Sequence, residues 1–271
     1  MTTAEARETL ETLETPSRRF EWAALTGIWY RELTLYKRYW MPSTFAAIVE
    51  PVLYLLAFGF GLGSLVGVIG GYRYIDFLGT GIVAMSVLFV SAFTALFATF
   101  VRRTFQHSYE AILAAPVDVH EVVTAEASWI AVRAGVYGCA PLVVALLFGL
   151  TPSWGMLAVP FIGVVTGMGF ALWGIWMSSI VPSINTMDYV ISGVITPLFL
   201  VAGTFFPLSQ LPAWLRSLAV VNPLYHTVEL VRHAATGWRP LADLGHFGAL
   251  LLFAVLAWLV AVAYMKKRLI D

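Results

Sequence analysis

Residues 77–101 read FLGTGIVAMSVLFVSAFTALFATFV and contain no Asp, Glu, Lys or Arg. The hydrocarbon core of a bilayer is about 30 Å thick, and an α-helix needs about 20 apolar residues to cross it. Only helices and closed barrels satisfy their own backbone hydrogen bonds in lipid, and an apolar run this long and uniform is typical of the helix. The stretch therefore predicts a helical membrane protein.

Five further apolar stretches lie around this one, so the sequence predicts an all-α membrane protein with six transmembrane helices. The composition agrees, because 59% of the residues are hydrophobic and only 12% are charged, against about 25% charged in a soluble domain. No charge occurs between Arg133 and Asp188, so two spans must share that stretch, with a turn at residues 151–153. The expected spans are residues 44–66, 77–101, 127–149, 155–180, 188–207 and 244–265.

The basic residues orient these spans. Eleven of the sixteen Lys and Arg residues fall before the first span, in the 102–126 loop or after the last span, and four fall in the loops on the other side. Cytoplasmic loops are enriched in Lys and Arg, so we expect both termini in the cytoplasm. The N-terminus lacks the apolar core and cleavage site of a signal peptide. We expect a cytoplasmic segment at 1–43, a transmembrane domain at 44–265 and a cytoplasmic tail at 266–271.

Residues 20–40 are the first of three distinctive segments outside the spans. Aromatic and leucine side chains recur there at spacings of three and four, with basic residues off that stripe. This pattern predicts an amphipathic helix in the membrane interface. Packing on a soluble partner is the alternative, but the span that follows at once favours the interface. The stripe consists of Trp22, Leu25, Trp29, Leu33, Tyr36 and Trp40.

The second segment is the cytoplasmic loop of residues 102–126. It predicts a helix over 105–115 that ends at Pro116, because proline cannot continue a helix. Asp118 and Glu121 have capping-box spacing for the next helix. The loop is either a solvated connector or an element that docks into a cleft on another protein. The residues expected to act in docking are Arg102, Arg103, Tyr109, Glu110, Leu113 and Pro116.

The third segment is the extracytoplasmic stretch of residues 208–240. It breaks at Asn222-Pro223, where Asn suits an N-cap and Pro the first helical position. Each half is about 13 residues long and too short to cross a bilayer. We predict a hairpin at 209–237 that enters the outer leaflet and returns; two surface helices are the alternative. The residues assigned to the hairpin are Phe205, Phe206, Pro207, Asn222, Pro223 and Tyr225.

Glu50 and Arg133 lie inside the first and third expected spans. Charged residues in a span are costly, face protein or water, and usually pair. Both lie about 10 Å from the cytoplasmic end of an outward-running helix. We therefore predict a structural ion pair between them, with substrate contact and snorkelling toward the interface as alternatives. Pro51 follows Glu50, so we also expect a kink there.

The sequence holds no constellation of catalytic residues. None of the three lysines follows a glycine, so there is no phosphate-binding loop of the G-x-x-x-x-G-K-[ST] kind. The single cysteine, Cys139, allows neither an intrachain disulfide nor a zinc site built on thiolates. The formal net charge is zero, so no global field points to nucleic acid. We expect no enzyme activity, metal or cofactor on this chain.

Three motifs, in order, carry a resemblance to a known family. They are EPVLY at 50–54 leading to GFGLG at 59–63, YEAILAAP at 109–116, and GTFFPL at 203–208 running on to NPL at 222–224. Together they resemble the membrane permease subunits of ABC-2 type transporters. The nearest branch is the NodJ-like one, which includes the nodulation lipo-oligosaccharide exporter and the daunorubicin-resistance permease. The likeness covers residues 29–265.

The resemblance implies an exporter driven by partner chains. Two permeases, either two copies of this chain or this chain with a relative, would form the pathway, and two separate ATPase subunits would bind ATP and Mg²⁺. Residues 105–116 would match the family's coupling helix, 20–40 its connecting helix and 209–237 its re-entrant helices.

We therefore expect a multi-pass permease of the bacterial cytoplasmic (inner) membrane, in contact with lipids and not with nucleic acid. It would export an amphipathic, lipid-linked or drug-like substrate. A membrane-embedded lipid-modifying enzyme and an ATP-independent carrier are the alternatives.

Overall fold

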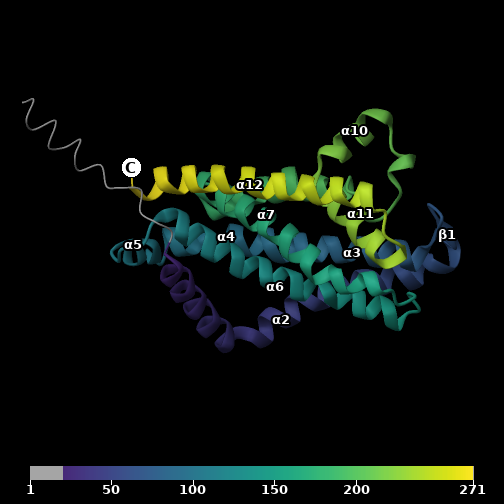
Figure 1. The fold of residues 1–271 in the computed structure, drawn as a ribbon, viewed down its shortest axis with the longest axis horizontal. Helices are drawn as coiled ribbons and strands as arrows, with labels where there is room; N and C mark the ends of the chain where they lie inside the picture. The colour runs from purple at the N-terminus through teal and green to yellow at the C-terminus, as the bar shows by residue number, and fades with distance from the viewer. Residues whose placement is uncertain (1–20, 271) are drawn as a thin grey trace, which may run out of the picture.

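The computed structural model describes residues 21–270, which form an elongated bundle of helices (Figure 1). The labels η1 and η4 mark π-helical turns, and η2, η3 and η5 mark 3₁₀ turns. The elements follow the chain in this order: α2 (Trp22–Val66), β1 (Val68–Ile69), β2 (Tyr72–Arg73), α3 (Tyr74–Leu88), η1 (Phe89–Phe93), α4 (Thr94–Thr104), α5 (Ser108–Leu113), α6 (Val119–Leu147), η2 (Trp154–Ala158), α7 (Val159–Ile180), η3 (Ile184–Thr186), α8 (Met187–Val190), η4 (Ile191–Ile195), α9 (Thr196–Leu200), η5 (Leu208–Gln210), α10 (Ala213–Val221), α11 (Pro223–Thr236) and α12 (Pro240–Ile270).

The two ends of the bundle differ in what they carry. Figure 1 shows α5 and the last turns of α12 at one end, which we call the α5 end. The short strands, α10 and α11 lie at the opposite end, which we call the α11 end. The expected start of the N-terminal segment, residues 1–20, lies outside the described residues.

Five helices in the described part of the chain are long and apolar enough to cross a membrane, by length and composition. The all-α membrane architecture predicted from the sequence agrees with this finding. The fifth predicted span, 188–207, has the wrong boundaries. Its apolar helix is shorter and covers Ile184–Leu200, because the chain turns at Gly203, whose φ of +80° is left-handed. The five long helices cover Trp22–Gly63, Tyr74–Thr104, Val119–Leu147, Trp154–Ile180 and Pro240–Ile270.

The expected interfacial helix and the first span are one bent helix, α2. Tyr39 has a φ of −121° and a ψ of 19°, outside the helical region, and it divides α2 into an N-terminal arm and a longer second part. The bend lies just before Pro42, whose ring crowds the preceding turn. Pro51 lies among residues with helical φ and ψ, so the non-helical residue of α2 is Tyr39 and not a residue beside Glu50, where the kink stays a prediction.

The N-terminal arm of α2 packs against α6. The Trp29 and Tyr36 rings meet Trp129 edge-on, with centroids 5.7 and 6.1 Å apart. Trp29 also donates a hydrogen bond to Ser128. The predicted apolar stripe is therefore divided, because these residues face the protein. Its other large members, Trp22, Leu33 and Trp40, are exposed.

The centre of the bundle is the pair α6 and α7, which approach very closely. A Cβ added to Gly163 would lie 2.8 Å from the Cα of Gly135, so both positions need glycine. Helix α7 packs on its other sides against α12 and α4. At the start of α6 the predicted capping box is present, and the Asp118 backbone N–H donates to the Glu121 carboxylate over 2.9 Å.

The α11 end contains one feature that was predicted from the sequence, the start of α11, and one that was not, a short β-hairpin. Asn222 caps α11 by accepting from the Leu224 backbone N–H, and Pro223 takes the first helical position, as predicted. The hairpin of β1 and β2 was not predicted, although Gly70-Gly71 supplies its turn with φ of +60° and +86°. Helix α11 packs against α3 and α12, whereas α10 stands away from the bundle (Figure 1).

The C-terminal helix α12 continues to Ile270. The tail expected at 266–271 is therefore not a separate segment over the residues that the structure describes.

Candidate functional site

A buried cluster of charges joins three helices at the α5 end. Arg31 lies 2.7 Å from Glu32 and 2.9 Å from Glu126, and Arg102 lies 2.7 and 2.8 Å from the same two carboxylates. Glu32 is 6% exposed and Glu126 is 2% exposed. We call these four residues the charge cluster. It is formally neutral, and each charge has two opposite partners, as a buried ion pair requires.

The charge cluster fixes the arm of α2, the end of α4 and the beginning of α6 relative to one another. Sequence reasoning assigned Arg102 to docking and missed Arg31, Glu32 and Glu126. One signal was available: Glu32 falls on the same helical face as Trp29 and Tyr36, and a carboxylate within an apolar stripe indicates a buried pair. One partner of Glu32, Arg31, is its neighbour in sequence, but the other, Arg102, lies 70 residues away along the chain and could not be identified from the sequence.

Tyr109 connects α5 to this cluster. Its hydroxyl donates to the second oxygen of Glu126 over 2.5 Å, and the residue is 1% exposed. Burial, followed by the nearby Glu126 charge, raises the pKa of the Tyr109 phenol well above its ordinary value, so it stays a donor. Leu113, from the same helix, packs against the apolar core beside it.

The six residues predicted for docking therefore divide into two groups. Arg102, Tyr109 and Leu113 face the protein, and Arg103 donates to the backbone carbonyls of Ser179 and Val181 at the end of α7. Only Glu110 and Pro116 lie on the exposed surface. Their neighbours on that surface are Phe105, Ala111, Ala114 and Ala115.

The helix predicted over 105–115 is shorter, and α5 covers only Ser108–Leu113. His107 takes a left-handed conformation with a φ of +49°, which ends the run from α4 and sets α5 at a new angle. The imidazole of His107 lies 2.9 Å from the Glu110 carboxylate on the exposed face.

A lateral cavity of about 480 Å³ opens between α2, η1 and α6. Glu50 and Arg133 both line it, so the structure brings these two predicted residues to the same cavity. The other lining residues combine apolar and hydroxyl-bearing side chains. They are Ser43, Ala46, Ala47, Pro51, Ser86, Phe89, Val90, Phe93 and Thr94.

The predicted ion pair between Glu50 and Arg133 is wrong, because no N–O contact within 4.0 Å joins them. The Arg133 guanidinium lies over the rings of Tyr36 and Tyr137, 5.3 and 5.6 Å from their centroids. This pair of rings holds Arg133 toward the arm of α2, whereas Glu50 is exposed on the second part of that helix. The Arg133 Nε and Ser86 Oγ atoms are buried without a hydrogen-bond partner.

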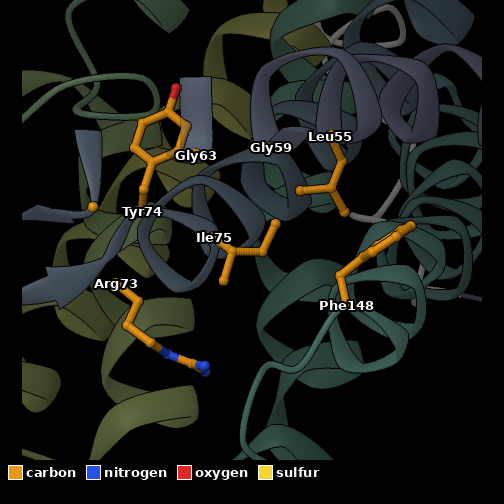
Figure 2. Close-up of a pocket in the computed structure, with 8 residues that line it drawn as sticks. Leu55, Gly59, Gly63, Arg73, Tyr74, Ile75 and Phe148 are labelled. Carbon is orange, nitrogen blue, oxygen red and sulfur yellow. The ribbon is translucent and has the colours of Figure 1, made fainter. Parts of the chain in front are cut away.

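A smaller cavity of about 290 Å³ lies at the α11 end, between the end of α2 and the start of α3 (Figure 2). Gly59 and Gly63 line this cavity. A Cβ added to Gly59 would lie 2.9 Å from the Ile75 side chain, so a larger residue at that position would crowd the space. Arg73 closes one side by pairing with Asp76 at 2.8 Å and donating to the Gly149 carbonyl.

The residues predicted for the hairpin pack against the α11 end of the bundle. The Phe205 ring lies 5.5 Å from Phe58 and 6.1 Å from Phe199, centroid to centroid. Phe206 and Pro207 are half-buried beside it, and the Tyr225 ring contacts His226 and His246. Sequence reasoning missed the anchor of this region, Arg232, whose guanidinium lies 4.1 Å from the Phe77 ring centroid and donates to the Gly203 carbonyl.

Comparison with known proteins identifies the family of this chain. Residues 24–236 match the family described as ABC-2 type transporter. The chain belongs to the ABC-2 type transporter family. Nodulation protein J of Rhizobium meliloti (strain 1021) is 33% identical over 258 residues, which cover 94% of this chain and 97% of the relative.

Two further relatives agree with this membership. Nodulation protein J of Rhizobium leguminosarum bv. viciae is 32% identical over 256 residues, covering 94% of this chain and 97% of the relative. Inner membrane transport permease YadH of Escherichia coli (strain K12) is 26% identical over 248 residues, covering 91% of this chain and 96% of the relative.

This ABC-2 permease is thus an integral membrane protein and the membrane subunit of a transporter. Within residues 21–270 no group of three or more His, Cys, Asp and Glu is placed to hold a metal ion.

Proposed function

We propose that this chain is the permease subunit of an ATP-driven exporter in a bacterial inner membrane. It would move an amphipathic, lipid-linked or drug-like substrate out of the cytoplasm, with ATP and Mg²⁺ bound by two copies of a separate ATPase subunit. The observation that carries the proposal is the hydrogen bond from Tyr109 to Glu126, which ties the short helix α5 to the charge cluster. The excess of basic residues assigns the α5 end and both termini to the cytoplasm.

In this proposal the exposed face of α5 contacts the ATPase. Glu110 and Pro116 belong to that face, and the residues beneath it carry motion inward. A displacement of α5 reaches α6 through Tyr109 and Glu126. It reaches α4 and the arm of α2 through Arg102, which is paired with both carboxylates. Because these contacts are buried and mutually paired, the three helices move as one body.

The substrate would enter the lateral cavity. Phe89 and Phe93 offer an apolar wall for a hydrocarbon or ring system, while Glu50 and Arg133 offer polar contacts. Both aromatic residues belong to the π-turn η1, and such turns occur frequently at functional sites. This mixture fits an amphipathic molecule better than an inorganic ion.

The uncovered surface of α2 is proposed to face lipid and a second permease, either a copy of this chain or a relative. Only 12% of the most apolar 18-residue stretch of α2 is buried within the protein. Its exposed side includes the large apolar residues Phe45, Leu53 and Tyr54. A groove along these three residues also includes Glu50. A second permease on this face would therefore adjoin the lateral cavity.

The remaining proposals concern the outer side. Helices α10 and α11 would form the re-entrant hairpin in the outer leaflet. The apolar helix Ile184–Leu200 would make the sixth crossing, since it is roughly 26 Å long at 1.5 Å per residue and the following turn adds depth.

The test uses the permease and its ATPase reconstituted in liposomes, with a fluorescent amphiphile as the transported probe. We expect no uphill transport by the permease alone. Accumulation of the probe without ATPase or ATP would identify an ATP-independent carrier and refute the proposal.

Tyr109→Phe tests the coupling step, because it removes one hydroxyl and keeps the ring. A hydrogen bond to a charged group contributes about 1.5–3 kcal/mol, so we expect transport per ATP hydrolysed to fall about tenfold while the complex still assembles. Tyr30→Phe is the matched control, since Tyr30 is exposed on the arm of α2. Equal transport by both variants would contradict the role given to Tyr109.

A further inference from the structure

A separate pocket of about 400 Å³ lies at the α5 end, between the last turns of α7 and α12. It is distinct from the lateral cavity and shares no lining residue with it. Its five lining residues are Ser179, Ile180, Tyr264, Lys267 and Arg268.

The two charged residues that line this pocket are both positive. Lys267 and Arg268 line it and form no ion pair with a carboxylate in residues 21–270. Arg103 adds a third cation, close enough to Arg268 for the two charges to repel. The Arg103 guanidinium donates to the carbonyls of Ser179 and Val181 and lies 5.5 Å from the Phe100 ring centroid, and within residues 21–270 it pairs with no carboxylate. An anion bound between these groups would relieve their repulsion.

The walls of the pocket favour an anion that carries apolar chains. Ile180 is 49% exposed beside it, and the Tyr264 ring lies 6.1 Å from Trp176. The Trp176 indole N–H is buried without a hydrogen-bond partner. Tyrosine and tryptophan together with Lys and Arg, at the end of an apolar helix, are the side chains found at the level of lipid headgroups. Free phosphate would use the charges but not the apolar wall.

We propose that this pocket binds the phosphate group of an anionic phospholipid, with its acyl chains along α7 and α12. Basic pockets between helices on the cytoplasmic side of membrane proteins hold such headgroups. The choice of the inner leaflet rests on the proposed orientation of the permease, but the binding itself does not. The bound lipid would fasten the end of α12 to the end of α7, next to the carbonyls that hold Arg103.

The experiment measures binding of phosphatidylglycerol and phosphatidylcholine to the delipidated full-length permease by native mass spectrometry. A basic residue near an anionic lipid contributes about 1 kcal/mol, so we expect about a fivefold loss of phosphatidylglycerol affinity in Lys267→Gln and in Arg268→Gln. Phosphatidylcholine binding should not change. Lys266→Gln is the matched control, because it removes the same charge from the adjacent residue, which is exposed but does not line the pocket.

Three results would overturn the proposal. Equal losses in Lys266→Gln and Lys267→Gln would show attraction by surface charge without a site. Displacement of phosphatidylglycerol by millimolar inorganic phosphate would identify a site for the free anion. Unchanged lipid binding in Arg268→Gln, with loss of the ATPase subunit from the complex, would assign the pocket to the protein partner. The binding assay contains neither ATP nor ATPase, so its failure and a failure of transport are separate results.

Discussion

The charge cluster and the lateral cavity both hold charged side chains within an apolar bundle, yet they treat those charges in opposite ways. In the charge cluster, every carboxylate has two guanidinium partners within 2.9 Å. In the lateral cavity, Glu50 and Arg133 line one space without pairing. Fully paired charges fix helices relative to one another, whereas unpaired charges beside a cavity are available to a ligand. The comparison separates a cluster of paired charges from the cavity that we propose as the binding site.

The largest expected effect tests the structural side of this comparison. Glu126→Ala removes one carboxylate partner from the half-buried guanidinium groups of Arg31 and Arg102 and removes the acceptor of Tyr109. Breaking a buried ion pair costs about 3–5 kcal/mol. We expect a large fall in the thermal unfolding temperature of the purified permease in detergent. Glu110→Ala is the control on exposed α5, where surface substitutions change stability by about 0.5 kcal/mol or less. Equal destabilisation by the two variants would show that the charge cluster is not structural.

The second prediction tests the binding side. Arg133→Gln should lower the apparent affinity for an acidic amphiphile about tenfold, as expected for one lost hydrogen bond to a charged group. The measurement is the substrate dependence of ATP hydrolysis by the assembled complex. The unfolding temperature should change far less than in Glu126→Ala.

Charge reversal sharpens the same point. In an open cavity, the double variant Glu50→Arg with Arg133→Glu should be as impaired in transport as either single reversal. Recovery of transport in the double variant would mean that the two residues pair during the transport cycle, and the cavity would then close around an ion pair.

The smallest expected effect lies at the α11 end and depends on pH. Burial, together with the neighbouring His246, lowers the pKa of His226 below its ordinary value of 6.5. The Nδ1 atoms of these two histidines are 2.8 Å apart, so only one proton fits between them. The unfolded chain then binds more protons than the folded one at low pH. Stability should be constant above pH 6.5 and decrease below it.

Thermal unfolding between pH 7.5 and 5.5 measures this effect. We expect His226→Gln to flatten the dependence, and His107→Gln, on the exposed face of α5, to leave it unchanged. An identical pH dependence in parent and His226→Gln proteins would remove His226 from the explanation.

Much of the fold could be predicted because its signals are local. Uniform apolar runs located five long helices, the Asn222-Pro223 pair located the start of α11, and the spacing of Asp118 and Glu121 located the start of α6. Each of these depends on residues within one or two turns of one another.

The errors share a different cause, since each depends on contacts between distant segments. The fifth span was predicted to continue to residue 207 because the residues around Gly203 are themselves mostly apolar. Arg133 was paired with Glu50 by depth alone, whereas two tyrosines decide its direction. Arg102, the partner of Glu32 from α4, is distant in sequence, and no local pattern identifies it. The docking residues were chosen by type, and the structure divides them by burial: Tyr109 and Leu113 face the interior, while their role in coupling stays a prediction.

The bend at Tyr39 divides α2 into two parts, and each part contributes to a different one of the two regions compared above. The arm before it carries Arg31 and Glu32 of the charge cluster, and the part after it forms a wall of the lateral cavity from Ser43 to Pro51. Tyr39, whose backbone angles are non-helical, separates the two parts of α2. A rotation of a few degrees there would move the arm and change the wall of the lateral cavity at the same time. In the proposed function, the coupling contacts and the substrate cavity therefore lie on either side of Tyr39, and a substitution that stiffens the helix there would uncouple them without changing either site.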